Sequence, residues 1–455
     1  MKAESIVEDL AGFRLNEGAQ RSLFGDAFGD ARLEARAAQV AVLDSFTVAG
    51  VEVPRVTNEF WAPRQRQGHS LHELSYRACF KAELPRFFIE RLTRPGDTVL
   101  DPFMGRGTTC LEAALLGRVP YGNDVNPLSR VLLEPRLDPP TSAEVAARLA
   151  DYAAEGIFDG AATQLGCQRP LGGEVDDSEL EVFYHPDTLR GLQALRRRFA
   201  QAPLDRVDAW LRMVATNRLS GHSPGFFSVR TMPPNQAVSV ESQRKLNAKH
   251  GLVPPKRDVS ALLVRKSRSL LRGLDAATRQ RLASQRATAR LSTDDARRMQ
   301  AFADSSVQLV VTSPPFVDVV DYAGDNWLRC WFNGIDAAST SQSITTPRKA
   351  DAWQDFVAAV MLELKRVLLP GGWIVFEVGE VRKGTLKLED LVVPAARAAG
   401  LEVVALAVHK QDFTKTANCW GVANNTKGTN TQRLVILRKA VRKAVRNASN
   451  EEAGA

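Results

Sequence analysis

Residues 101–109 read Asp101-Pro102-Phe103-Met104-Gly105-Arg106-Gly107-Thr108-Thr109, and they lie between a short apolar run, 98–100, and a helical stretch that ends before Gly117. Parallel α/β sheets bind ligands where their strands end, and glycines there let the backbone approach a ligand closely. Cys110 occupies the place of the third glycine in the dinucleotide fingerprint G-x-G-x-x-G, which argues against a pyrophosphate cradle. The stretch therefore predicts a strand, a ligand-binding glycine loop and a helix. A tight structural turn is the alternative.

A second stretch of this kind lies about 200 residues further along the chain. The apolar run 307–311 predicts a buried strand that leads directly into Thr312-Ser313-Pro314-Pro315-Phe316. Around both stretches, short β-rich runs alternate with helical ones, and this alternation predicts an α/β fold built on a mostly parallel sheet. The other predicted elements are strands near 121–124, 373–378, 401–405 and 434–437 and a helix near 353–369.

The residues between the two stretches predict an inserted, mainly helical domain. Thr141-Ser142-Ala143-Glu144 has the pattern of a capping box that opens a helix, and 204–219 predicts another helix. The loop-like run 222–235 contains Phe226 and Phe227, which we expect to be exposed. The predicted divisions are an N-terminal helical extension (1–65), the first part of the α/β domain (66–138), the insert (139–290), the second part of the α/β domain (291–438) and a disordered tail (439–455).

The positive charge of the chain is concentrated in one segment. The net charge is +8 over 455 residues, and residues 243–290 alone contain 13 Lys or Arg against two acids. Such a basic block suits a polyanion, because phosphate contacts release condensed counterions; a solvated pair of basic helices is the alternative. The five cysteines include no C-x-x-C pair, so we predict neither a disulfide framework nor a metal site. No apolar run approaches the roughly 18 residues of a membrane span, and we expect a cytoplasmic protein.

The glycine loop resembles the cofactor-binding motif of the amino-group DNA methyltransferases, D-P-F-x-G-x-G-T-T after a strand. The resemblance implies a Rossmann-like fold that uses S-adenosylmethionine and no metal. Asp124, at the end of the next strand, would accept hydrogen bonds from the ribose hydroxyls, with a helix cap as the alternative. Asp295 stands where an acid of the family approaches the adenine, although Asp294 beside it reads equally well as a helix cap. The residues placed around the methionine part of the cofactor are Asp101, Pro102, Phe103, Gly105, Gly107 and Thr108.

Residues 313–316 resemble the catalytic tetrapeptide of the same family, [DNS]-P-P-[YFW]. An exocyclic amine is a poor nucleophile because its lone pair is delocalised into the ring. An enzyme must therefore hold acceptors against its N–H groups and align the nitrogen with the methyl group. The Ser313 side chain and the Pro314 carbonyl would be these acceptors, in a loop that Pro314 and Pro315 stiffen. Phe316 would stack on the target base after it is flipped out of the duplex.

The tetrapeptide also bears on the target base. Carbon-5 cytosine methylation needs a cysteine nucleophile that follows a proline, and no cysteine follows a proline here. In the family, a serine at this place usually goes with N4 of cytosine, and aspartate or asparagine with N6 of adenine. Ser313 therefore predicts a cytosine-N4 enzyme. An adenine-N6 enzyme and an RNA enzyme acting on tRNA guanine, whose relatives usually have an aspartate and a separate RNA-binding domain, are the alternatives.

The order of the two motifs implies where the target is recognised. A cofactor loop, an insert and then a catalytic loop form the arrangement called alpha, in which the insert carries target recognition. The basic block of the insert suits that role, and the implied partner is double-stranded DNA. The sequence leaves open which site is recognised and whether a cognate restriction endonuclease accompanies the enzyme.

Overall fold

The computed structural model describes residues 3–14, 41–61, 68–76, 79–158, 177–201, 203–232, 238–316, 322–343, 347, 349–381, 385–410 and 431–441. The predicted disordered tail lies outside these residues from 442 onward. None of the helices among them is both long and apolar enough to cross a lipid bilayer.

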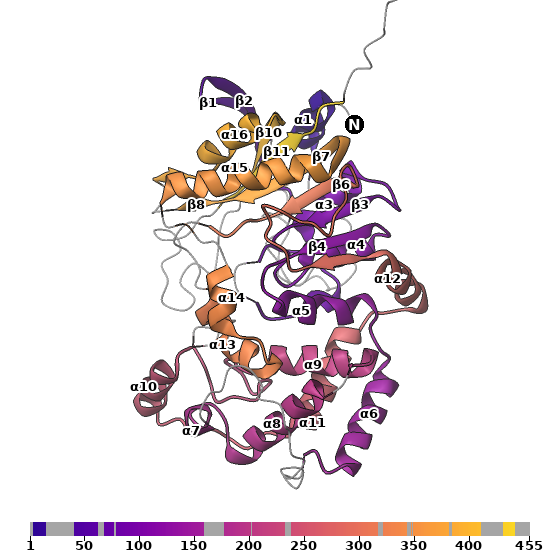
Figure 1. The fold of residues 1–455 in the computed structure, drawn as a ribbon, viewed down its shortest axis with the longest axis vertical. Coiled ribbons are helices and arrows are strands. Elements are labelled where there is room, and N and C mark those ends of the chain that lie inside the picture. Colours follow the sequence, from indigo (N-terminus) through magenta and orange to yellow (C-terminus); the bar gives the residue numbers. More distant parts are fainter. Residues whose placement is uncertain are drawn as a thin grey trace, which may run out of the picture.

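A nine-stranded sheet forms the centre of the fold (Figure 1). Its order is β1-β2-β10-β11-β7-β6-β3-β4-β5, and the strands from β7 to β5 are parallel to one another. β11 is antiparallel to both of its neighbours, β7 and β10. This arrangement confirms the predicted α/β fold on a mostly parallel sheet. These strands are β3 (Thr98–Asp101), β4 (Val119–Asn123), β5 (Arg290–Ser292), β6 (Val307–Thr312), β7 (Leu368–Val378), β10 (Glu402–Lys410) and β11 (Thr431–Arg438), while β8 (Glu380–Val381) and β9 (Leu386–Lys387) form a separate pair.

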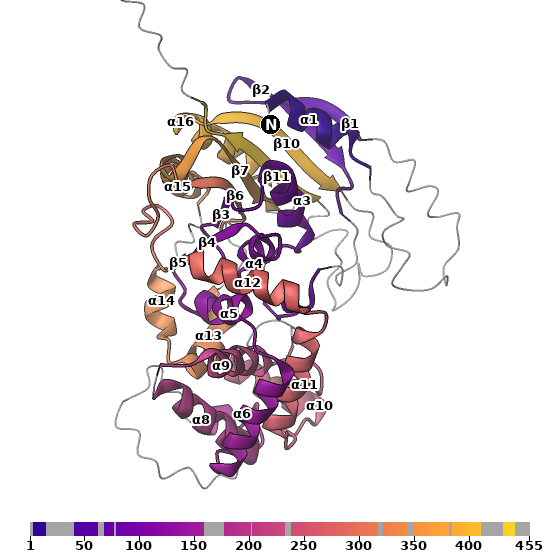
Figure 2. The same ribbon diagram turned by 90° about the vertical axis from the view of Figure 1, so that its right-hand side faces the viewer.

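Alternation along the inner strands divides the core between the two faces of the sheet. Val99 and Val311 pack with helices α1 and α3 on one face, whereas Leu100 and Val310 pack with α15 and α16 on the other. Because successive side chains of a strand point to opposite faces, strands covered on both faces are apolar throughout. Figure 2 shows the two pairs of helices on opposite sides of the strands. These helices are α1 (Ala3–Gly12), α3 (Glu83–Leu92), α15 (Ala350–Val367) and α16 (Glu389–Ala398).

The N-terminal part of the chain adds a hairpin to this sheet. β1 (Val42–Val48) pairs antiparallel with β2 (Val51–Asn58), and β2 pairs parallel with β10. The turn residues Ala49 and Gly50 both have positive φ, 49° and 72°, as the two-residue hairpin turn with left-handed geometry requires. The prediction of a helical extension over residues 1–65 is therefore wrong for this segment. Val53 of β2 is buried on one face of the sheet and Val56 on the other. The amino-acid composition of the segment does not reveal this burial.

The residues between β4 and β5 form a layer of helices at the opposite end of the molecule from β1 (Figure 1). The inserted domain is mainly helical, as predicted. Two helices pack against elements on the other side of a predicted domain boundary. Helix α12 of the insert packs against α4 and β4, and α13 of the α/β domain packs against α8 and α9. The domain boundaries themselves stay a prediction. The helical layer comprises α5 (Leu128–Leu137), α6 (Ser142–Ala154), α7 (Asp177–Leu180), α8 (Pro186–Ala200), α9 (Arg206–Arg218), α10 (Val240–His250), α11 (Val259–Leu271) and α12 (Ala276–Thr288). The remaining helices are α4 (Thr108–Leu115), α13 (Tyr322–Asn333), α14 (Ala337–Ser343) and the 3-10 turn Ser70–His72.

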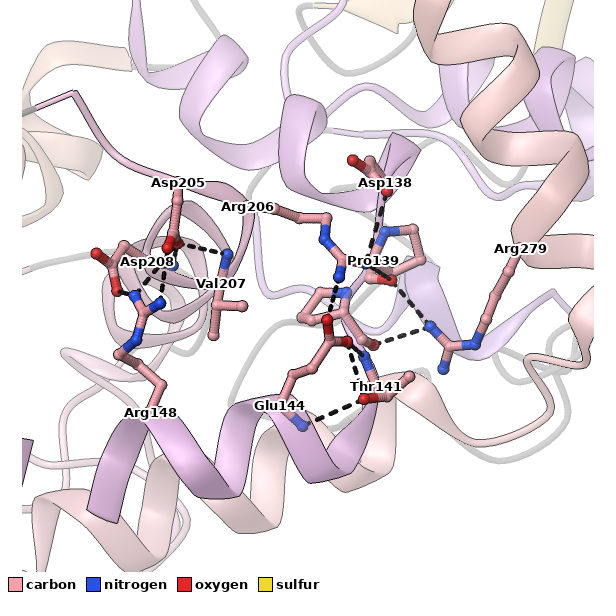
Figure 3. Close-up of polar contacts among 11 residues, drawn as sticks. Asp138, Pro139, Thr141, Glu144, Arg148, Asp205, Arg206, Val207, Asp208 and Arg279 are labelled. Atoms are coloured by element: carbon pink, nitrogen blue, oxygen red, sulfur yellow. Dashed lines mark hydrogen bonds and ion pairs between the residues drawn. The ribbon is translucent and has the colours of Figure 1, made fainter. Parts of the chain in front are cut away.

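A network of polar contacts anchors the start of α6 to the rest of the molecule (Figure 3). The predicted capping box is confirmed, because the Thr141 side chain accepts from the Glu144 N–H and the Glu144 carboxylate accepts from the Thr141 N–H. Arg206 donates to the same carboxylate. Arg279 of α12 donates to the Pro139 carbonyl at 2.9 Å. One arginine of the basic block is therefore used to hold the structure together.

The loop after α9 buries its aromatic side chains. Phe226 and Phe227 are 7% and 0% exposed, so the prediction that they are exposed is wrong. The Phe227 N–H donates to the Arg218 carbonyl at 2.9 Å, which folds the loop back onto the end of α9. Gly221 lies so close to the Phe226 ring that a Cβ there would approach it to 2.4 Å.

Candidate active site

The glycine loop turns directly out of β3 into α4. Gly105 and Gly107 have φ of 49° and 77°, in the left-handed region that favours glycine. At Gly107 a Cβ would also lie 2.8 Å from Cδ1 of Leu133 in α5, so this position has no room for a side chain. The Gly105 N–H donates to Oδ2 of Asp124 at 2.8 Å. The loop is thereby tied to the end of β4.

Asp101 connects the glycine loop to the strand before Ser313. Its Oδ1 accepts hydrogen bonds from the Phe103 N–H at 3.1 Å and from the Thr312 hydroxyl at 2.7 Å. Burial raises the pKa of Asp101 to about 7, and the hydrogen bond from Thr312 opposes that rise. Because Thr312 is the last residue of β6, this contact fixes the relative positions of the two predicted motifs.

Asp124 lies where β4 ends, beside the glycine loop. Its two carboxylate oxygens accept from the backbone N–H groups of Gly105 and Asn126, at 2.8 and 2.9 Å. Although the side chain is partly exposed, desolvation raises the pKa of Asp124 to about 6. The alternative of a helix cap is not what the structure shows, since α5 begins after Pro127 without a side-chain cap.

Asn123, which the sequence analysis did not single out, connects three segments. Its side-chain N–H groups donate to the Pro102 carbonyl at 3.2 Å and to the Asp294 carbonyl at 2.9 Å. Its oxygen accepts from the Ser292 hydroxyl at 2.5 Å and from the Asp294 N–H at 2.9 Å. The Asn123 amide therefore donates two hydrogen bonds and accepts two, and it holds the glycine loop against the turn that carries Asp295. No local pattern signals the role, because these partners are far away in the sequence.

Residues 69–76, here called the strap, were also missed. The strap lies between the glycine loop and the helical layer. Arg106 donates to two of its carbonyls, those of His72 and Leu74, at 3.2 and 2.8 Å. From the other side, Asn217 of α9 donates to the Ser75 carbonyl at 2.9 Å. The strap therefore contacts both the predicted cofactor loop and the insert.

The strap, the glycine loop and the end of β6 surround one cavity. Its volume is about 890 Å³, the open mouth included. Nine of the twelve predicted site residues line it, whereas Gly107, Pro314 and Phe316 do not. The lining comprises Tyr76, Cys79, Phe80, Asp101, Pro102, Phe103, Met104, Gly105, Arg106, Thr108, Asn123, Asp124, Val125, Asn126, Asp295, Ala296, Ser313, Pro315 and Phe356.

Asp295 lines the cavity at the turn after β5. Its carboxylate forms an ion pair with Arg297 at 2.5 Å, and this hydrogen bond holds the pKa of Asp295 below its usual value. Asp294 instead accepts from the Ala301 N–H at 3.2 Å and is absent from the cavity wall. Among the residues that the structure describes, no three His, Cys, Asp or Glu side chains are placed to hold a metal ion together.

Residues of α15, of β7 and of the position just after β7 contact the Ser313 loop. Trp353 donates to the Pro315 carbonyl at 2.8 Å, and the Phe316 ring packs against Gly379, where a Cβ would lie 3.3 Å from Cε2. Glu377, which is 9% exposed, accepts a hydrogen bond from the Ser313 hydroxyl, and burial raises the pKa of Glu377 to about 7. The sequence analysis missed Glu377, although an acid inside the apolar run 373–378 is an unusual feature.

Comparison with known proteins finds similarity to DNA methyltransferases. Residues 34–128 match a family model described as DNA methylase. The type II methyltransferase M.BsoBI of Geobacillus stearothermophilus is 40% identical over 72 residues, and the type II methyltransferase M.MjaII of Methanocaldococcus jannaschii is 32% identical over 74 residues. Over these residues the chain is similar to DNA methyltransferases.

The matches to family members are short. They cover 15% and 16% of this chain and 14% of each of the two relatives. A putative DNA modification methylase of Thermus thermophilus, solved in complex with S-adenosyl-L-methionine, is 24% identical and covers 34% of this chain and 57% of its own, with a TM-score of 0.21. The family model includes the hairpin, the glycine loop and Asp124 but ends before Ser313.

Proposed function

We propose that this chain is an S-adenosylmethionine-dependent DNA methyltransferase that methylates the exocyclic N4 of cytosine in duplex DNA. The proposal depends chiefly on one observation: Ser313 and Pro315 line the same cavity as Asp101, Gly105 and Asp124. A methyl donor held by the glycine loop and an amine held at Ser313 would be neighbours. Direct transfer between two bound groups requires such proximity and alignment.

The cavity wall has the chemistry that S-adenosylmethionine needs. Each carboxylate oxygen of Asp124 accepts one backbone N–H and keeps lone-pair capacity for a ribose hydroxyl. Phe103 and Phe356, with ring centroids 6.0 Å apart, offer apolar surface for the adenine beside Asp295. Gly105, which has no side chain, lines the cavity where the methionine part would lie. When bound, the cofactor supplies a methyl group activated by a sulfonium sulfur.

The residues of the chain position the amine in this mechanism. The Ser313 hydroxyl oxygen and the Pro314 carbonyl accept hydrogen bonds from the two N–H groups of the cytosine amine. Two contacts preorganise their loop, those between Thr312 and Asp101 and between Trp353 and Pro315. Preorganised acceptors need not be rearranged when charge develops during transfer. Phe316 stacks on the flipped base with the part of its ring that Gly379 does not cover.

The choice of cytosine over adenine depends on the family tendency for a serine at position 313. The test is to incubate the protein with unmethylated duplex DNA and labelled S-adenosylmethionine, digest the DNA to nucleosides and identify the product by mass spectrometry. We expect N4-methylcytosine. N6-methyladenine would retain the enzyme class but contradict the base assignment. Label on tRNA with none on DNA would contradict the DNA proposal and favour the RNA alternative.

The contact between Ser313 and Glu377 predicts how the rate depends on pH. The ionised Glu377 carboxylate accepts a hydrogen bond from the Ser313 hydroxyl, so the oxygen of that hydroxyl can accept a hydrogen bond from the amine. Once Glu377 is protonated, its carboxyl group no longer holds the Ser313 hydroxyl in this orientation. We expect kcat to fall about tenfold per pH unit below pH 7 and to level off above it. Glu377→Gln, which accepts the same hydrogen bond without titrating, should give a flat profile between pH 6 and pH 8.

A control separates Glu377 from Asp101, whose pKa is also raised to about 7. Asp101→Asn keeps an oxygen that can accept from Thr312, and its kcat profile should retain the inflection near pH 7. If Glu377→Gln retained the parental inflection and Asp101→Asn lost it, the role given to Glu377 would be refuted. The cofactor KM, measured in parallel, shows whether either substitution acts on binding instead.

A further inference from the structure

Four basic side chains gather where the helical layer meets the strap. Arg218 ends α9, Arg265 and Lys266 lie on α11, and Arg329 lies on α13; we call these four the cationic cluster. Arg218 and Arg265 both contact the loop 224–226, which places them near each other. Arg329 and Arg265 both lower the pKa of Arg218, after desolvation, and Arg218 likewise lowers that of Lys266. Three helices that are separate in the sequence bring these charges together.

Two members of the cationic cluster have protein partners that are well defined. Lys266 is 3.8 Å from the Glu73 carboxylate in the strap. Arg329 is 5% exposed and donates to Asn326 at 2.6 Å and to the Ser75 carbonyl at 3.1 Å. These two side chains hold the helical layer to the strap.

Arg218 and Arg265 differ from them. Arg218 donates to the carbonyl and the side-chain oxygen of Asn217 and lies 4.0 Å from the Phe226 ring centroid, and Arg265 donates to the Pro224 carbonyl at 3.3 Å. Among the described residues, no carboxylate lies within ion-pair distance of either guanidinium. A guanidinium has five N–H donors, so both keep donors for another acceptor. Like charges that have no acid beside them are stabilised when an anion binds between them.

We propose that Arg218 and Arg265, with the loop 221–226 beside them, bind a phosphate of the DNA backbone. This inference rests on the proposed function and names a contact site for its substrate. Arg265 is exposed, and its guanidinium is 3.7 Å from where a Cβ of Gly225 would be, so the loop and the helix approach each other closely there. Arginine suits this task because its planar fork donates two parallel hydrogen bonds to a phosphate.

The location relates this phosphate site to the cavity. Asn217, next to Arg218, donates to the Ser75 carbonyl at 2.9 Å. Tyr76, the residue after Ser75, lines the cavity. A phosphate bound at Arg218 is therefore held at a fixed place relative to the cofactor site. Phosphate contacts fix the register of a protein on a duplex, whereas contacts with bases carry the sequence information.

The site also narrows the role of the basic block. Several members of the block bind other groups of the protein itself. Arg279 and Arg281 donate to backbone carbonyls, Arg272 pairs with Glu73 at 3.1 Å, and Lys256 pairs with Asp187 at 2.8 Å. The positive charge of the basic block therefore does not by itself show which of its residues contact DNA. Arg265 belongs to the block, whereas Arg218 lies outside it.

The test compares three variants, Arg265→Ala, Arg218→Met and Arg286→Ala. Arg286 is an exposed arginine of α12 and provides a control with the same loss of charge. Binding of a labelled duplex is followed by fluorescence anisotropy at several salt concentrations, with S-adenosylmethionine saturating. We expect Arg265→Ala and Arg218→Met each to weaken binding about tenfold. Each should also reduce the slope of log K against log salt by about one. Arg286→Ala should match the parent protein.

The outcomes separate the phosphate site from the proposed function. If the parent binds duplex with a steep salt dependence and the two variants behave like it, the phosphate site is wrong while the proposed function stands. The site is equally wrong if Arg286→Ala loses as much affinity as they do. If the parent binds RNA and no duplex DNA, both proposals fail. Arg265→Ala removes an exposed side chain, and an unchanged cofactor affinity shows that its fold is intact.

Discussion

Replacing Ser313 by alanine should reduce kcat for DNA methylation by about 100-fold or more, because the amine then loses one of its two acceptors at the moment its proton must leave. The cofactor site should stay intact, since the glycine loop and Asp124 do not depend on the Ser313 hydroxyl for any described contact. The measurement is single-turnover methylation with cofactor and DNA both saturating, together with the cofactor Kd from titration calorimetry.

A second substitution guards against a trivial loss of structure. Ser313→Thr keeps a hydroxyl that can donate to Glu377, so it should recover part of the activity that Ser313→Ala loses. A rate for Ser313→Ala equal to that of the parent, with normal cofactor binding, would remove Ser313 from the catalytic residues. An equal loss in both variants together with weak cofactor binding would instead show that the loop had collapsed.

Gly107→Ala should be the most damaging single-methyl change in the cofactor loop. At φ of 77° an alanine is strained by about 1–2 kcal/mol. The new Cβ would also lie 2.8 Å from Leu133, and overpacking of this kind costs about 1–3 kcal/mol. We expect the free energy of unfolding to drop by roughly 3 kcal/mol, measured by urea denaturation, and the cofactor affinity to fall as the loop moves.

Gly156 provides the matched control for that experiment. It has φ of 70°, and no atom lies within 4 Å of where its Cβ would be. Gly156→Ala should therefore show the backbone strain alone, about 1–2 kcal/mol, with unchanged cofactor affinity. Equal losses of stability for the two variants would mean that the contact with Leu133 contributes nothing and that our reading of the loop is wrong.

Local patterns predicted the elements that surround the site. β3 and β6 occur where apolar runs precede the two motifs, and α6 begins at the predicted capping box. These predictions succeeded because a strand buried on both faces and a capped helix each leave a continuous signature over a few residues. The hairpin 42–58 was mistaken for helix because its pairing partner, β10, lies about 350 residues away.

The two motifs, their order around an insert and the α/β class could be predicted from the sequence, since each is written in contiguous residues. The contact between Glu377 and Ser313, the three segments that Asn123 connects and the position of the strap against both the cofactor loop and the insert emerged only from the folded structure. It also separated the arginines that hold the fold together from Arg218 and Arg265. Such roles depend on contacts between distant parts of the chain, which burial and charge create only after the sheet and the helical layer have assembled.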